Sequence, residues 1–328
     1  MWDFKLGQVI STLWKTKSFL LFRFLIYMTI TVAYIVSTGV GGGLGYLIGK
    51  TGNGEGAGVF YGMVGGFSLV TGVLYYLREY LLYMVKTGHI ACIVKILDGE
   101  PIPEGKHQIK YAQGVVKERF KESSVLFILD QMIKKILKAF NRVFFSVASW
   151  LPIPDGLIRF INAVVNTSIT YVDEIMLAYN IRNNEENPWE GSRKALVLYG
   201  QNYKTFLKNA VFLTAITWIL SLLVLIMVYG PIAALMYYGN YEGSVMVFVM
   251  SLVVAWGIKS ALIDPLAMTA LMQVYFKVIE GQEPNPEWDA KLERASKKFT
   301  ELKDKAVAWT KRKMGGGSDK PADDTPAS

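Results

Sequence analysis

Three short polar motifs each occur twice in this chain, in the same order, and every copy flanks a long apolar run. The first copies are Lys17–Leu20, Gly52–Gly56 and Lys95–Gly99, and the second copies are Lys204–Leu207, Gly239–Gly243 and Lys277–Gly281. Hairpins can resemble one another without a common origin, but agreement at three places in the same order favours a duplication. We therefore predict two tandem helical-hairpin repeats, over residues 14–120 and 201–302.

Four apolar runs within these repeats are long enough to cross a bilayer. A spanning helix needs about 20 apolar residues to cross roughly 30 Å of hydrocarbon. The runs are Phe19–Ile48, Val59–Val85, Phe206–Tyr238 and Ser244–Ile263. Hydrophobic residues make up 52% of the chain and charged residues 19%, and both values differ from soluble averages in the direction of membrane proteins. The sequence thus predicts an all-α polytopic membrane protein, integral to its membrane.

Lysine and arginine lie mainly on one side of the predicted crossings. The short connections 49–58 and 239–243 together contain a single basic residue, Lys50. Because positively charged loops stay in the cytoplasm, we expect a multi-pass topology with both termini cytoplasmic. The net charge of +8 then gathers at the cytoplasmic face, where the expected partners are the lipid bilayer and its anionic lipid headgroups. No recognition motif accompanies the basic residues, so we expect no nucleic acid partner. Arg23 lies near one end of its run and is expected to reach the interface.

Residues 121–200 are predicted to form a central amphipathic helix pair between the repeats. Val125–Trp150 carries Asp130 and four basic residues mostly on one face, with apolar residues opposite. Leu157–Tyr179 follows after two prolines and has spanning length. Two crossings here would give six spans, and none would give four. The basic residues of the first helix argue against a crossing, whereas the length of the second favours one. We prefer six spans and keep four as the alternative.

A polar stripe follows one face of the second central helix. It consists of Arg159, Asn162, Asn166, Thr170 and Asp173, and Glu174 adjoins it. Spacings of three and four residues place the stripe on one helical face. A polar group that faces lipid costs on the order of several kcal/mol, so the stripe must face other helices, a cavity or water. We predict these six residues as a polar pathway. The alternative is that Asp173 and Glu174 are solvated near the cytoplasmic end of the helix.

Six glycines form two series in the first repeat, each with a spacing of four residues. They are Gly41, Gly45, Gly49, Gly58, Gly62 and Gly66, and the loop 49–58 joins the two series. Small residues at this spacing let helix backbones approach closely within lipid. We predict helix packing along this line, either within the hairpin or between copies in a homo-oligomer.

The end of the chain carries an amphipathic segment and then a low-complexity tail. Apolar residues between Trp288 and Trp309 alternate in steps of four and three, which is a heptad seam, and basic residues surround them. Such a helix could lie on an anionic membrane or pack against the helix that follows the first repeat, where Ile109, Ala112 and Val116 form a weaker seam. The composition of residues 314–328 predicts disorder.

The residues that carry enzyme chemistry are sparse. His89 and His107 are the only histidines, Cys92 is the only cysteine, and neither histidine has a ligand pattern around it. We therefore expect no catalytic, cofactor-binding or metal-binding residues, and no cofactor. The predicted function is a transporter or channel-like protein for a small solute or ion. The alternative is a non-catalytic membrane scaffold or lipid-binding protein that uses basic amphipathic helices. No residue pattern names a substrate.

Overall fold

The computed structural model describes residues 2–51, 54–119, 123–145, 155–238 and 244–315, and within these ranges it contains helices and no strand. This confirms the all-α prediction. The elements are α1 (Leu6–Lys15), α2 (Lys17–Lys50), α3 (Glu55–Leu97), α4 (Lys106–Arg119), α5 (Ser123–Phe145), α6 (Asp155–Arg182), α7 (Pro188–Gln201), α8 (Tyr203–Tyr238), α9 (Ser244–Ile258), the π-helix η2 (Lys259–Ile263), α10 (Asp264–Val278), α11 (Pro286–Ala295) and α12 (Lys297–Gly315).

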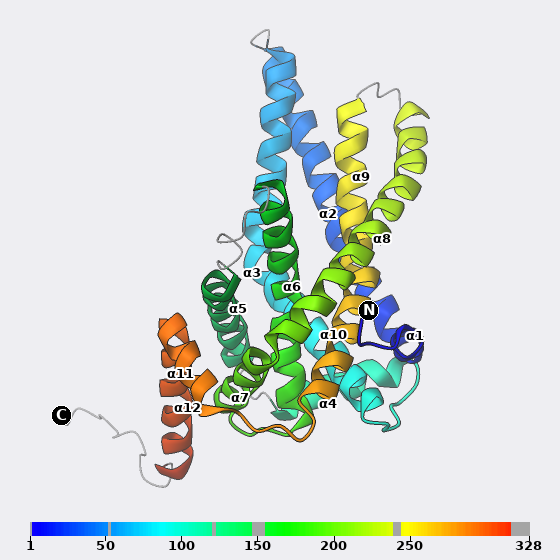
Figure 1. Cartoon of the computed structure of the whole chain (residues 1–328). Coiled ribbons are helices and arrows are strands. Elements are labelled where there is room, and N and C mark those ends of the chain that lie inside the picture. Colours follow the sequence, from blue (N-terminus) through cyan, green and yellow to red (C-terminus); the bar gives the residue numbers. More distant parts are fainter. Residues whose placement is uncertain (1, 52–53, 120–122, 146–154, 239–243, 316–328) are drawn as a thin grey trace, which may run out of the picture.

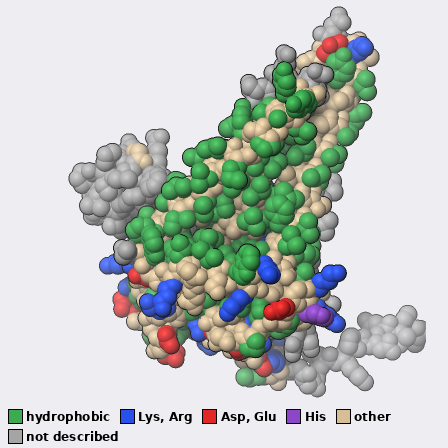
Figure 2. Space-filling model, turned by 90° about the vertical axis from the view of Figure 1, so that its right-hand side faces the viewer, with side chains coloured by type: hydrophobic (Ala, Val, Ile, Leu, Met, Phe, Trp, Pro, Cys, Tyr) green, Lys and Arg blue, Asp and Glu red, His purple; other side chains and the backbone are tan. Residues whose placement is uncertain are grey.

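Three helical stretches are long and apolar enough to cross a membrane, counted over the described ranges. They are Lys17–Lys50, Tyr203–Tyr238 and Met246–Val278. Large apolar side chains are exposed along them, among them Val36 on α2 and Ile226 on α8. Figure 2 shows apolar side chains covering the elongated part of the molecule, while charged side chains gather on the lower part. An exposed apolar surface of this extent suits lipid and not water, so the chain is a membrane protein.

The elongated part consists of two helical hairpins that rise from a helical body (Figure 1). In the first hairpin α2 and α3 run antiparallel along most of their length, and in the second α8 lies beside α9. The π-helix η2 joins α9 to α10 without a break in the chain direction, so the second hairpin continues down into the body. Pro265 is the second residue of α10, one residue after this π-helical turn (the π-turn), and a missing N–H is tolerated in the first turn of a helix.

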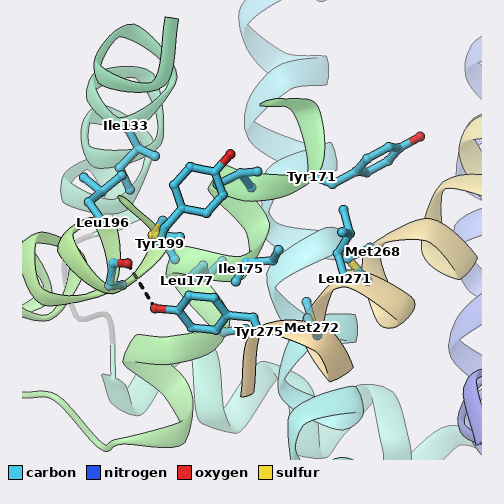
Figure 3. Packing of buried hydrophobic residues seen from close by; sticks show 14 of the residues in the cluster. Ile133, Tyr171, Ile175, Leu177, Leu196, Tyr199, Met268, Leu271, Met272 and Tyr275 are labelled. Atoms are coloured by element: carbon cyan, nitrogen blue, oxygen red, sulfur yellow. Dashed lines mark hydrogen bonds between the residues drawn. The ribbon is translucent and has the colours of Figure 1, made fainter. Parts of the chain in front are cut away.

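The body has its own apolar core, formed mainly by α5, α6, α7, α10 and α12. Figure 3 shows Ile175 of α6 between Leu196 of α7 and Met272 of α10. The buried Tyr275 hydroxyl donates a hydrogen bond of 3.1 Å to the carbonyl oxygen of Ala195, so its polar tip is satisfied within this core. The body therefore holds the lower ends of α6 and α10 in fixed relative positions.

The C-terminal seam packs in a way that the sequence did not indicate. The expected single helix is interrupted at Ser296, which has an extended backbone (φ −149°, ψ 112°), and this divides it into α11 and α12. Leu292, Phe299 and Leu302 are buried against the body, where α12 contacts α7 and α5. The helix α4, one of the two alternatives considered for the partner of this seam, packs instead on α3 and α2. The apolar faces of α5 and α7 lie closer to the seam, and they take up its hydrophobic residues.

Candidate functional site

A cavity of about 240 Å³ lies where the hairpins enter the body, and charged residues from four parts of the chain line it. They are Lys86 of α3, Asp130 and Lys134 of α5, Asp173 and Glu174 of α6, and Lys259 and Asp264 at the two sides of the π-turn. Aromatic side chains, including Tyr27, Tyr83 and Trp256, complete the wall. The carboxylates of Asp130, Asp173 and Glu174 are almost fully buried and need partners, because desolvation of an unpaired ion costs several kcal/mol.

Ion pairs connect these charges across the cavity. The Nζ atom of Lys86 lies 2.9 Å from an oxygen of Glu174, and Nζ of Lys259 lies 2.6 Å from Asp264. Lys134 is shared, with its Nζ atom 2.7 Å from Asp130 and 3.3 Å from Asp173. Three lysines therefore face four carboxylates, and the cavity carries one excess negative charge when all seven groups are ionised.

Asp173 is the carboxylate with the poorest compensation. Its side chain is 3% exposed, and its Oδ1 atom has no hydrogen-bond partner among the described residues. Burial, and after it the nearby Asp130, raise the pKa of Asp173 well above its usual value, against the opposing effect of Lys134. Burial alone would lower the pKa of Lys134, but Asp173 and Asp130 raise it. Lys134 thus stays charged, and a proton on Asp173 would make the cavity electrically neutral.

The π-turn connects the cavity to α6 and to α2. The Tyr171 hydroxyl donates a 2.8 Å hydrogen bond to Oδ1 of Asp264, the same oxygen that Lys259 approaches. In a π-helix the N–H of residue i bonds to the carbonyl of residue i−5, and Pro265 has no N–H to offer Ser260. Arg23 of α2 takes this place, because its Nη2 atom donates a 3.0 Å hydrogen bond to the carbonyl oxygen of Ser260.

The expectation that Arg23 reaches the interface is wrong. Its side chain is 1% exposed and points toward the second hairpin, with Tyr27 beneath it at 5.9 Å from guanidinium carbon to ring centroid. The carbonyl released by Pro265 offers a stronger partner than headgroup water, and this explains the inward orientation. The Nε and Nη1 atoms of Arg23 have no hydrogen-bond partner among the described residues.

The predicted polar stripe lies on α6, and the structure describes the side chains of only its last residues. Asp173 and Glu174 face the cavity. The other four stripe residues lie nearer the N-terminal end of α6, and their side chains are outside the described residues: Arg159, Asn162, Asn166 and Thr170. The stripe as a continuous pathway is therefore a prediction still.

Sequence reasoning missed five charged residues of the cavity as members of one site. They are Lys86, Asp130, Lys134, Lys259 and Asp264. Asp130 and Lys134 were assigned only to the polar face of an amphipathic helix, and Lys86, Lys259 and Asp264 were given no role in a site. The available signal was the presence of charges within or directly beside apolar runs, which are costly there unless they pair.

The six glycines bring α2 and α3 into backbone contact. A Cβ atom on Gly41 would overlap the carbonyl oxygen of Gly62, and one on Gly45 would overlap that of Gly58. Gly49 and Gly66 meet opposing backbone in the same way, at Gly54 and Ser37. The glycines face each other within the hairpin, which is the geometry of packing inside one chain.

No group of three or more His, Cys, Asp or Glu side chains in the described ranges could hold a metal ion. Comparison with protein-family models, with curated proteins and with solved structures finds no match for this chain. The chemistry of the cavity is therefore the main guide to function.

Proposed function

We propose that this chain is a multi-pass membrane transporter or channel-like protein for a small cation, with the charged cavity as the point where the cation binds. The observation that carries this proposal is the buried Asp173 carboxylate. It lies in a cavity with more carboxylates than lysines, and one of its oxygens has no hydrogen-bond partner among the described residues. An unsatisfied buried acceptor costs about 1–3 kcal/mol, so a cation that binds this oxygen would recover part of that cost.

The topology proposed with this function places both hairpins across the membrane and both termini in the cytoplasm. The distribution of lysine and arginine supports it, since the connections at 49–58 and 239–243 contain only Lys50. We propose four crossings, because the apolar face of α5, which includes Ile133 and Ile136, is buried in the body and is not available to lipid. The three motifs shared by residues 14–120 and 201–302 support an origin of the two hairpins by duplication.

The size and charge of the cavity suit a small cation. One water molecule occupies about 30 Å³ of liquid, so a cavity of this volume has room for an ion with a few waters or for a small organic cation. When Asp173 loses its proton, the excess negative charge attracts a cation, and the partnerless oxygen supplies a ligand. Passage between the hairpins would then need Lys134 to shift its contact from Asp173 to Asp130 alone.

Flux measurements on protein in liposomes test this proposal. A panel of monovalent inorganic and small organic cations would be assayed with the unaltered chain, with Asp173→Asn and with the matched control Glu287→Gln, an exposed residue of α11. We expect flux of at least one cation, a loss of about tenfold or more in Asp173→Asn, and no change in the control. Equal flux in Asp173→Asn and the unaltered chain would exclude the cavity as the path.

The second candidate function is a non-catalytic membrane scaffold. The observation in its favour is a set of ion pairs that joins helices at the surface of the body, where Arg193 and Lys303 from different helices both pair with Asp289. Such a surface is rigid and suited to holding a partner. The absence of flux for every cation in the panel, with a chain that is folded and inserted, would favour the scaffold over the transporter.

A further inference from the structure

The short helix α1 has an apolar face that the rest of the described chain leaves uncovered. Val9 and Leu13 are buried against the bundle, whereas Leu6, Ile10 and Trp14 are 38%, 53% and 69% exposed. These three residues are spaced by four and lie on one side of the helix, next to the buried side. Ser11 and Lys15 occupy a third, polar side of the helix and are also exposed. The helix thus has separate faces for protein, for an apolar medium and for water.

The position of α1 is fixed at both ends. Before it, Asp3 pairs with Lys208 at 2.6 Å and accepts a 2.7 Å hydrogen bond from Asn209, both at the start of α8. After it, the Thr16 hydroxyl lies 3.0 Å from Nε2 of His89 on α3. Both attachments are made where α8 and α2 begin, so α1 lies beside the lower end of the membrane-spanning helices (Figure 1).

The segment just before α1 also reaches the apolar exterior of the second hairpin. The Trp2 ring, itself 40% exposed, packs edge-on against Phe212 of α8 with 5.7 Å between ring centroids. Phe212 belongs to a helix that is apolar enough to span the membrane. An apolar medium that covers Phe212 therefore also reaches Trp2, four residues before Leu6.

Three exposed lysines surround this face. They are Lys5, Lys15 and Lys17, and none of them takes part in an ion pair within the described ranges. The Nζ atom of Lys17 lies 5.2 Å from the centroid of the Trp14 ring. Tryptophan with adjacent lysine is the composition typical of helices that lie at a membrane interface, where the ring sits at the headgroup level and the ammonium group meets phosphate.

We propose that α1 lies in the plane of the membrane interface, with Leu6, Ile10 and Trp14 among the upper acyl chains and with Lys5, Lys15 and Lys17 bound to the phosphate groups of anionic lipids. A second copy of the chain is a poorer occupant, because three side chains on a ten-residue helix offer far less than the roughly 1,000 Å² that a stable interface buries. The proposal rests on the membrane location of the chain and is independent of any transport activity.

Site-specific fluorescence on the full chain in liposomes tests the orientation of α1. In a Cys92→Ala background, the variants Ile10→Cys and Ser11→Cys would each carry an environment-sensitive probe on the introduced thiol. We expect the probe at Ile10 to be quenched by shallow acyl-chain spin labels and protected from aqueous iodide, and the probe at Ser11 to show the reverse. Quenching of both probes by iodide alike would overturn the proposal, and so would protection of Ile10 from both quenchers, which would mean that protein covers the face.

The lipid preference is tested with the same probe at Ile10. Spin-labelled phosphatidylglycerol and spin-labelled phosphatidylcholine would be compared at equal mole fraction. Each lysine close to an anionic surface is worth about fivefold in lipid preference, so we expect clearly stronger quenching by the anionic lipid. The triple substitution Lys5→Gln, Lys15→Gln, Lys17→Gln should bring the two lipids close to equality, while the control Lys311→Gln on α12 should not. Equal quenching by both lipids in the unaltered chain would reject anionic-lipid binding.

Discussion

Alanine substitution at two glycines of α2, two residues apart, should change stability in opposite directions. A Cβ atom on Gly43 meets nothing within 4 Å, whereas a Cβ atom on Gly45 would lie closer to the backbone of Gly58 than the 3.0 Å below which real Cβ atoms essentially never come. Both positions are in a helix interior, where alanine is favoured over glycine by about 0.5–1 kcal/mol. We expect Gly43→Ala to gain this amount in the free energy of unfolding.

At Gly45 the overlap outweighs the gain in helix propensity. The obstructing atom is a backbone carbonyl oxygen and not the end of a flexible side chain, so α2 and α3 must separate. Overpacking of this kind costs about 1–3 kcal/mol, which leaves a net loss of up to about 2.5 kcal/mol after the gain is subtracted. Because both variants share the gain in helix propensity, they should differ by the overlap cost alone, about 1–3 kcal/mol in the free energy of unfolding.

The only cysteine of the chain provides the assay. Cys92 is buried beside Phe19 and Val85, and burial raises the pKa of its thiol to about 12, so the folded chain reacts slowly with thiol reagents. A fluorogenic thiol dye then reports the melting temperature in detergent. Gly43→Ala should melt above the unaltered chain and Gly45→Ala below it. The argument for backbone contact fails if Gly45→Ala melts together with Gly43→Ala.

Two further outcomes concern the charged cavity. Lys134→Met should lower the free energy of unfolding by about 1–3 kcal/mol, because it leaves Asp130 and Asp173 facing each other without their shared cation. The added substitution Asp130→Asn removes one of the two negative charges, so it should restore part of the lost stability in the same melting assay. The melting temperature should also fall as pH rises from about 4 through the raised pKa of Asp173, because over that range the folded chain holds a proton that the unfolded chain has released. Asp173→Asn should flatten this fall, and an equally steep fall in that variant would show that another group causes it.

Local patterns in the sequence indicate where the helices lie and which glycines share a helical face, because both depend on neighbours along the chain. Apolar runs define α2, α8 and α9, and a spacing of four residues is enough to put Gly41 and Gly45 on one face. The adjacent acids Asp173 and Glu174 could be singled out because they are unusual on an apolar helix. Their surroundings could not be predicted, since the partner Lys134 depends on how α5 packs on α6.

Other features depend on contacts between distant segments. The inward orientation of Arg23 follows from a carbonyl released by a proline on a different hairpin, and no pattern near Arg23 indicates it. The break at Ser296 interrupts a seam that is regular in the sequence, because α11 and α12 each turn toward the body helices that can bury them. In both cases tertiary packing decides between local options of similar energy.

The π-turn between α9 and α10 sets the rotation of the core-facing side of α10 relative to the lipid-facing side of α9. In an uninterrupted α-helix, residues five apart point about 140° away from each other, so Lys259 and Asp264 could not pair. The wider turn brings the two onto one side and rotates every residue of α10 relative to α9. Loss of one residue from this turn would keep both helices intact, yet it would point the core face of α10 away from α6 and α7. The lipid-facing pattern of α9 and the core pattern of α10 can therefore vary in sequence independently of each other, provided that the length of this one turn is kept.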